Sequence, residues 1–204
     1  AIPRDQVRQL TPKLGLHPAL SPLMPLWERK ELAWLQGVGY PKPNRSHFRS
    51  IEIWDTASDS EEVRDKGWLS GLFAQYPLPA GFTAEGVLLG RGDAGPLSGG
   101  TTRTMALHDP AQLFRQAGAL KPLSASTTNR ALAHVLEVRR EISQAAIDVQ
   151  QRVQEAPPLA MDFPPHTFGK QLEVAARLIA AKVPVAVIKV THGSFDTHAG
   201  QLST

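Results

Sequence analysis

The most apolar stretch of the chain is "VPVAVIKV", residues 183–190. β-Branched residues dominate it without alternating with polar ones, which is the pattern of a parallel strand covered on both faces. Helical periodicity in "TFGKQLEVAARLIAAK", residues 167–182, predicts a helix that leads directly into this strand. A helix followed by a buried strand favours the α/β class, with helices packed on a mixed, mainly parallel sheet.

Other helices are predicted by the same periodicity and by capping residues. Over residues 127–155, apolar positions recur at steps of three and four, which predicts an unusually long amphipathic helix. At residues 109–120, Asp109 is the expected cap and Pro110 the first helical residue. Shorter helices are expected at residues 46–57 and 67–76.

Three further apolar runs predict strands, at residues 32–40, 86–90 and 103–107. The first of them, "LAWLQGVGY", is bounded by glycines and precedes the predicted helix at 46–57, so we expect a strand, a loop and a helix in succession. In open parallel sheets functional groups gather at the carboxyl ends of the strands. The polar residues that follow 32–40 and 183–190 are therefore the candidates for a functional site.

Composition removes several classes of function. The 204 residues are 42% hydrophobic, enough for a sizeable core, and the absence of cysteine excludes disulfides, thiolate zinc sites and cysteine nucleophiles. No apolar run approaches the roughly 20 residues of a membrane-spanning helix, so we expect no membrane span. The net charge is only +3 and the basic residues are dispersed, so we expect no nucleic-acid partner.

The first candidate cluster is "SFDTH", just after the apolar strand. Asp196 and His198 are two residues apart, so in extended chain they point to the same side. Carboxylate oxygen and imidazole nitrogen together suit zinc, manganese or calcium. His192 is close in sequence. The alternative is a solvated loop in which the aspartate caps a turn and the histidine has no special role.

The second candidate cluster is "NRSHFRS", at the start of a predicted helix. Backbone N–H groups at a helix start favour an anion, and Arg45, His47 and Arg49 add donors. The Ser46 hydroxyl placed there could attack a phosphate or sulfate ester.

The alternative for this second cluster is purely structural. Asn44 or Ser46 would cap the helix, and the arginines would pair with Glu52 or Asp55. Capping by Ser46 and catalysis by the same residue are compatible.

Two other features are expected to be structural. "GRGDAG", residues 90–95, lacks the strand-to-helix context of a phosphate loop, so we expect a turn. His17, His108, His134 and His166 have no partners at metal-ligand spacing, so we expect surface or hydrogen-bonded core residues.

"GVGYPKPNRSHFRSIEIWDTAS", "GWLSGLF", "FGKQLEVAARLIAA" and "SFDTHAGQ" follow one another along the chain. In this order they resemble a bacterial family of domains of unknown function, family 1501, over nearly the whole chain. That family resembles the alkaline phosphatase and sulfatase superfamily. The resemblance implies a large α/β domain with a metal site at the carboxyl edge of its sheet, in a protein that is periplasmic or otherwise exported.

The resemblance also implies roles for individual residues. Asp196 and His198 match the family's Asp-x-His metal pair, and Ser46 with His47 matches its Ser-His pair at a helix start. Position 194 is serine where the family more usually has glycine. Its members carry an acidic segment before this stretch and an Asp-His-Gly segment after it, so the resemblance implies that residues 1–204 are part of a single domain without its N- and C-terminal segments. We therefore expect a divalent metal in the intact protein and none held tightly by residues 1–204 alone.

Two functions are compatible with these expectations. The first is a metal-dependent hydrolase acting on small-molecule phosphate or sulfate esters, with Ser46 as nucleophile, Arg45, His47 and Arg49 as anion binders, and Asp196 and His198 as metal ligands. The second is a non-catalytic exported binding or assembly module on the same fold.

Overall fold

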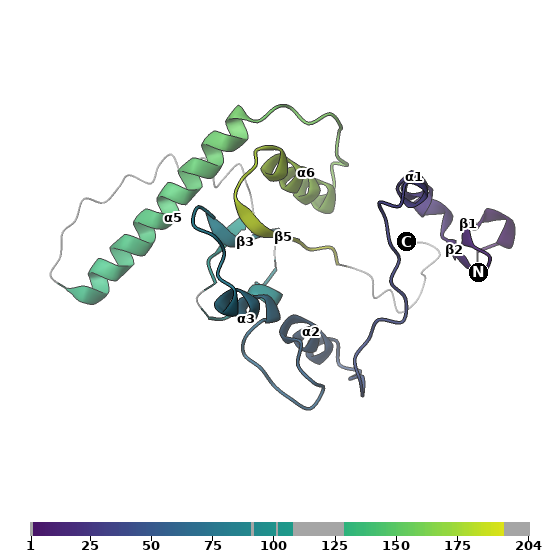
Figure 1. Cartoon of the computed structure of the whole chain (residues 1–204), viewed down its shortest axis with the longest axis horizontal. Helices are drawn as coiled ribbons and strands as arrows, with labels where there is room; N and C mark the ends of the chain where they lie inside the picture. Colours follow the sequence, from purple (N-terminus) through teal and green to yellow (C-terminus); the bar gives the residue numbers. More distant parts are fainter. Residues whose placement is uncertain (1, 91, 101, 108–128, 194–204) are drawn as a thin grey trace. The chain divides into compact units, whose positions relative to one another are not determined.

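A computed structural model describes residues 2–90, 92–100, 102–107 and 129–193. The chain forms two compact units, Ala1–Pro43 and Asn44–Thr204 (Figure 1). That residues 1–204 are part of a single alkaline phosphatase and sulfatase-like domain stays a prediction. Within the described ranges, no helix has the length and the apolar composition needed to cross a membrane.

The first unit is built around a small antiparallel hairpin. Strands β1 (Arg8–Thr11) and β2 (Leu14–Leu16) pair with each other, and the 3-10 helix η1 (Arg4–Gln6) precedes them. After the hairpin come the 3-10 helix η2 (Pro18–Leu23) and the short helix α1 (Met24–Glu28).

The strand predicted at residues 32–40 is wrong, because this segment has no regular secondary structure. Leu35 and Val38 are 85% and 63% exposed. Gly37 adopts a positive φ of 66°, which interrupts an extended run. A strand also needs a neighbour for its backbone hydrogen bonds, and none of the described strands pairs with this segment.

The second unit contains a parallel sheet of three strands in the order β4-β3-β5, of which Figure 1 labels β3 and β5. These are β3 (Ala84–Leu89), β4 (Thr104–Leu107) and β5 (Val185–Val190), with β3 in the centre. Their register aligns Leu89 with Leu107 on one side and with Val190 on the other. The strands predicted at 86–90, 103–107 and 183–190 are confirmed, and the architecture is α/β.

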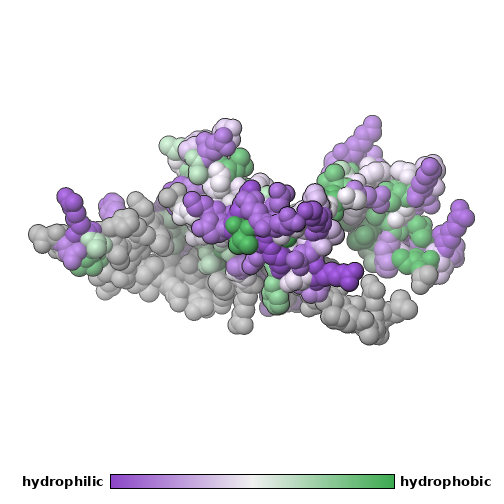
Figure 2. All heavy atoms as spheres, turned by 90° about the horizontal axis from the view of Figure 1, so that it is seen from below, coloured by the Kyte–Doolittle hydropathy of each residue, from purple (hydrophilic) through white to green (hydrophobic). Residues whose placement is uncertain are grey.

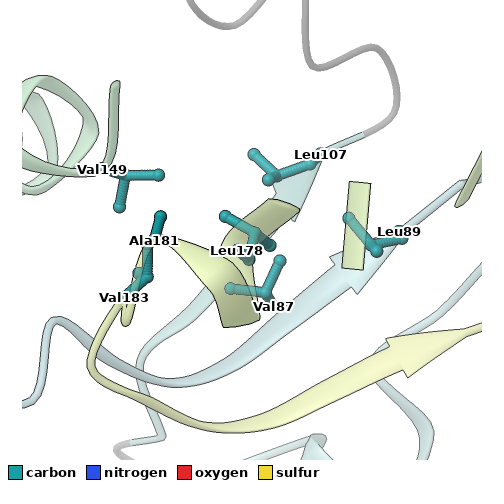
Figure 3. Close-up of a cluster of buried hydrophobic side chains, with 7 residues drawn as sticks. All are labelled: Val87, Leu89, Leu107, Val149, Leu178, Ala181 and Val183. Atoms are coloured by element: carbon teal, nitrogen blue, oxygen red, sulfur yellow. The ribbon is translucent and has the colours of Figure 1, made fainter. Parts of the chain in front are cut away.

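Two helices cover one face of this sheet. They are α5 (Arg130–Glu155), which begins after its cap Asn129, and α6 (Thr167–Ala180), which ends shortly before β5. Figure 3 shows the core that α5, α6 and the strands enclose; its members are Val87, Leu89, Leu107, Val149, Leu178, Ala181 and Val183. These contacts confirm the two long amphipathic helices. The helix predicted at 109–120 lies outside the described residues.

The opposite face carries α2 (His47–Thr56) and α3 (Trp68–Gln75), as Figure 1 shows. The 3-10 helix η3 (Gly95–Leu97) belongs to the same layer. η3 contacts both α2 and α3. It approaches β3 at Gly86, where a Cβ would lie 2.4 Å from Cδ1 of Leu97. The absence of a side chain at Gly86 therefore lets this layer pack close to the sheet. The helices predicted at 46–57 and 67–76 are confirmed.

The surface seen in Figure 2 is largely hydrophilic over the described residues, with hydrophobic residues in small separate patches. Several large apolar side chains are nevertheless exposed on α2, among them Phe48 at 84% and Ile51 at 54%.

Candidate functional site

The carboxyl ends of β3 and β5 lie side by side, because Leu89 is aligned with Val190 in the parallel register. Residues after Leu89 and residues after Val190 therefore leave the sheet at the same edge. This is the edge at which open α/β sheets bind ligands. The described polar groups at this edge come from β5, from the loop after β3, and from helices on both faces of the sheet.

On the α2 face, the Lys189 side chain connects β5 with the loop after β3 through hydrogen bonds and an ion pair. Its Nζ atom donates to the main-chain oxygen of Asp93 at 2.9 Å and to the carboxylate Oδ1 of Asp93 at 3.1 Å. The Lys189 side chain is 26% exposed. Asp93 is the aspartate of "GRGDAG". Residues 92–94 of that segment have no regular secondary structure and Gly95 begins η3, so the expected turn stays a prediction.

Asp55, in the last turn of α2, faces the same ammonium group. Gly95 has a φ of +53°, and a Cβ there would lie 2.6 Å from Lys189 Nζ and 3.0 Å from Asp55 Oδ1. Burial raises the pKa of Asp55; the positive charge of Lys189 opposes this rise, and the negative charge of Asp93 adds to it. One lysine thus lies near two carboxylates.

On the α6 face, Gln171 connects the ends of both strands. Its side-chain Oε1 accepts a hydrogen bond from the backbone N–H of Thr191 at 2.8 Å. Its Nε2 lies close over Gly90, because a Cβ on Gly90 would be 2.5 Å from it. Gln171 is only 8% exposed, and its hydrogen bond with Thr191 is partly buried.

His192 follows directly and stacks on Phe168 of α6, with ring centroids 4.5 Å apart and an interplanar angle of 20°. Lys189, Thr191 and His192 thus all make side-chain or backbone contacts at the carboxyl end of β5. Asp196 and His198 lie outside the described residues, so their assignment as a metal pair stays a prediction. In the ranges that the structure describes, no group of three or more His, Asp or Glu residues could hold a metal ion.

The second predicted cluster lies at the start of α2, and Ser46 caps that helix. Its Oγ accepts from the backbone N–H of Arg49 at 3.4 Å, while its own N–H donates to Oδ1 of Asn44 at 2.8 Å. Arg45, Ser46 and His47 are exposed there. Ser46 therefore caps α2, as the structural alternative for this cluster predicted, and Ser46 is exposed at the surface.

Arg49 has a structural role in the loop after α2. Its guanidinium donates to Oε2 of Glu52 at 3.1 Å and to the main-chain oxygens of Asp59, Ser60 and Glu62. The Arg49 side chain is only 17% exposed. To bind an anion, Arg49 would have to give up some of these acceptors, so its predicted role as an anion binder stays a prediction.

Ser46 lies at the start of α2, whereas Asp55, which is near Lys189, lies in its last turn. Ser46 precedes Asp55 by nine residues, and at 1.5 Å per residue this is about 13 Å along the helix axis. The strand expected to lead into Ser46 is absent, so the reason for placing Ser46 at the sheet edge is wrong. Among the described residues, Ser46 is not brought beside Lys189 or Asp55.

Sequence reasoning missed Lys189, Asp93 and Gln171. Two features of the sequence could have indicated them. Lys189 is a charged residue inside the apolar run "VPVAVIKV", and Gln171 lies close to the apolar positions of α6. It also missed that His17 and His166 are helix caps, whose Nδ1 atoms each accept a backbone N–H at 3.1 Å. The other two histidines that were expected to be structural cannot be compared, because His108 and the side chain of His134 lie outside the residues that the structure describes.

No protein-family model, no curated protein and no solved structure matches the chain. The resemblance to family 1501 therefore stays a prediction.

Proposed function

We propose that the protein is a metal-dependent hydrolase of phosphate or sulfate esters, with an alkaline phosphatase and sulfatase-like fold. The observation that carries the proposal is the exit of β5. This strand ends beside β3 at the ligand-binding edge of a parallel sheet, and the chain reaches Asp196 and His198 six and eight residues after Val190.

In this proposal Asp196 and His198 bind the metal, which would stabilise negative charge on the ester group. The Ser46 hydroxyl attacks phosphorus or sulfur and loses its proton to solvent, and the bond to the ester oxygen breaks so that the alcohol leaves. Water then hydrolyses the seryl ester. Arg45, His47 and Arg49 hold the anionic group, and the helix start favours its charge.

This assignment makes one demand on a described residue. The Arg49 guanidinium is bonded to Glu52 and to the main-chain oxygens of Asp59, Ser60 and Glu62, so Arg49 must exchange one of these acceptors for the substrate.

The test is hydrolysis of p-nitrophenyl phosphate and p-nitrophenyl sulfate by the intact protein supplied with zinc, manganese or calcium. We expect metal-dependent turnover that Asp196→Ala and Ser46→Ala abolish. Ser46→Asn is the matched control, because asparagine keeps the cap but has no hydroxyl nucleophile. Turnover by Ser46→Asn at the wild-type rate would exclude Ser46 as the nucleophile, and metal binding undiminished by His198→Ala would exclude the metal pair.

The exposed apolar stripe of α2 favours a second function, a non-catalytic exported binding or assembly module. Phe48, Ile51 and Trp54 follow one another at steps of three and are 84%, 54% and 51% exposed. Exposed aromatic residues on one helix face are typical of protein-binding surfaces. If the metal-supplied protein hydrolyses neither ester, this second function becomes the better proposal.

A further inference from the structure

We propose that residues 32–36 of one copy of this chain add a β-strand to the open edge of β5 in a second copy. Such pairing does not depend on the proposed hydrolase activity. It accounts for two features of the described residues. One is a segment with strand composition that forms no strand, and the other is a strand of interior composition at the edge of its sheet.

The donor segment, "LAWLQ", is an exposed run of five residues. The N–H of Glu31 still donates to the main-chain oxygen of Leu26, and Gly37 ends the run with a φ of 66°. Within the described part of the chain, residues 32–36 form no backbone hydrogen bond. Leu35 is 85% exposed and Trp34 is 36% exposed. Pairing as a strand would remove apolar surface from water and give the backbone groups partners.

The acceptor is the side of β5 that faces away from β3. The central strand β3 is buried at five of its six positions, whereas none of the six positions of β5 is buried and Ala186 is exposed. Natural edge strands are usually short or carry charges that prevent further pairing. The single charge in β5 is Lys189, whose ammonium group is already bonded to Asp93. The edge of β5 therefore lacks these protections.

The other described strands offer no comparable edge. β4, on the opposite side of β3, has only four residues, and exposed positions alternate with less exposed ones along it. This is the usual form of an edge strand. The hairpin strands β1 and β2 have four and three residues. Among the described strands, β5 is therefore the open edge that is long enough and apolar enough to accept residues 32–36.

A second copy supplies the matching half of each contact. Every copy carries one donor segment and one open edge, and the described strands of a single chain pair with neither. In an added strand, Leu32 and Trp34 would lie on one face of the sheet and Ala33 and Leu35 on the other. β5 also carries apolar side chains on both faces. Main-chain hydrogen bonds would provide affinity, and these side chains would continue the apolar surface of β5 on each face.

The experiment measures self-association of the 204-residue chain by sedimentation equilibrium, together with hydrogen exchange of its backbone amides. We expect association, with protection of residues 32–36 that rises with protein concentration. Leu35→Asp should weaken association about 10-fold or more, because a buried leucine is lost and a carboxylate would be desolvated. Val63→Asp is the matched control, since Val63 is also an apolar residue with 80% exposure, and it should leave association unchanged.

Ala186→Lys tests the acceptor side of the contact. Ala186 is exposed in β5, and a lysine on an edge strand opposes the addition of another strand. Association should fall about 10-fold, as with Leu35→Asp, while the urea unfolding midpoint stays near that of the wild type. Ala74→Lys, at an exposed alanine of α3, is the control and should change neither quantity.

Three results would overturn the proposal. The first is a chain that stays monomeric at every concentration, and the second is association that neither Leu35→Asp nor Ala186→Lys weakens. The third is protection of residues 32–36 that is absent or independent of concentration; in the latter case the strand pairs within its own chain. If Ala186→Lys does not fold, Leu35→Asp still decides, because it replaces a side chain that is exposed in the single chain.

Discussion

The side-chain nitrogen of Gln171 and the backbone of Gly90 are so close that no Cβ fits between them, since it would lie 2.5 Å from Nε2. Gly90 also has a φ of +81°, which L-amino acids other than glycine rarely adopt. The end of β3 is thus shaped around a side chain of α6.

Gly90→Ala should destabilise the protein by about 1–3 kcal/mol, because the strained φ adds to displacement of the Gln171 amide. Urea unfolding measures this change. Gly71→Ala is the control: a Cβ on Gly71, in α3, meets no atom within 4 Å, and alanine favours a helix. Equal stability of wild type and Gly90→Ala would contradict the close approach.

Asp55 should make stability fall as pH rises. Burial raises its folded-state pKa above the ordinary value of 3.8, so between these two pKa values the folded protein binds more protons than the unfolded chain. The free energy of unfolding contributed by this group therefore decreases as pH rises through that window.

The matched variant is Asp55→Asn, which removes this titration. Its unfolding midpoint should gain on that of the wild type as pH rises through the window, and the difference should level off above it. Urea unfolding at several pH values checks this. A difference that runs in the opposite direction would show that Lys189 outweighs burial at this carboxyl.

Glu85 should have the opposite pH dependence. Burial alone would raise the pKa of Glu85, but hydrogen bonds from the Arg103 side chain and backbone, together with the Arg103 charge, lower it overall. The folded-state pKa lies below the unfolded value, so this stabilisation is present above the unfolded pKa and is lost as pH falls through the folded one.

In Glu85→Gln, part of the acid-induced loss of stability should disappear. The side chain of Glu85 is 13% exposed and its Oε1 lies 2.9 Å from Nη2 of Arg103, so both partners matter. Arg103→Gln should therefore flatten the same part of the pH profile. If neither variant differs from the wild type in its acid unfolding midpoint, the pair does not contribute to stability.

Ser46→Ala should destabilise the protein by about 1 kcal/mol, because the N–H of Arg49 loses the cap that Ser46 Oγ provides. Ser46→Asn should restore most of this stability, since asparagine is also a favourable cap. Thermal or urea unfolding of the three proteins measures the cap separately from any role in hydrolysis. Equal stability of all three would show that Ser46 does not contribute as a cap.

The local pattern of residues was sufficient for most elements of the second unit. The β-branched run at 183–190 and the three- and four-residue periodicity before it predicted β5 and α6, because strand and helix periods differ and are read from neighbouring positions. Ser46 was expected to open a helix, and it does so through a hydrogen bond to a residue three positions away. Such features depend on interactions within a few residues.

The features that the sequence did not predict depend on contacts between residues far apart in the chain. "LAWLQGVGY" has the composition of a strand, but a strand forms only where another segment accepts its backbone hydrogen bonds, and sequence composition does not specify that partner. Likewise, Asp55, Asp93 and Lys189 are far apart in the chain, and only the parallel register of β3 and β5, with α2 against η3, brings them together. The sequence therefore determined the local elements by itself. Tertiary packing decided the group of Asp55, Asp93 and Lys189 and the contact of Gln171 with the strand ends, because these contacts join residues that share no local pattern.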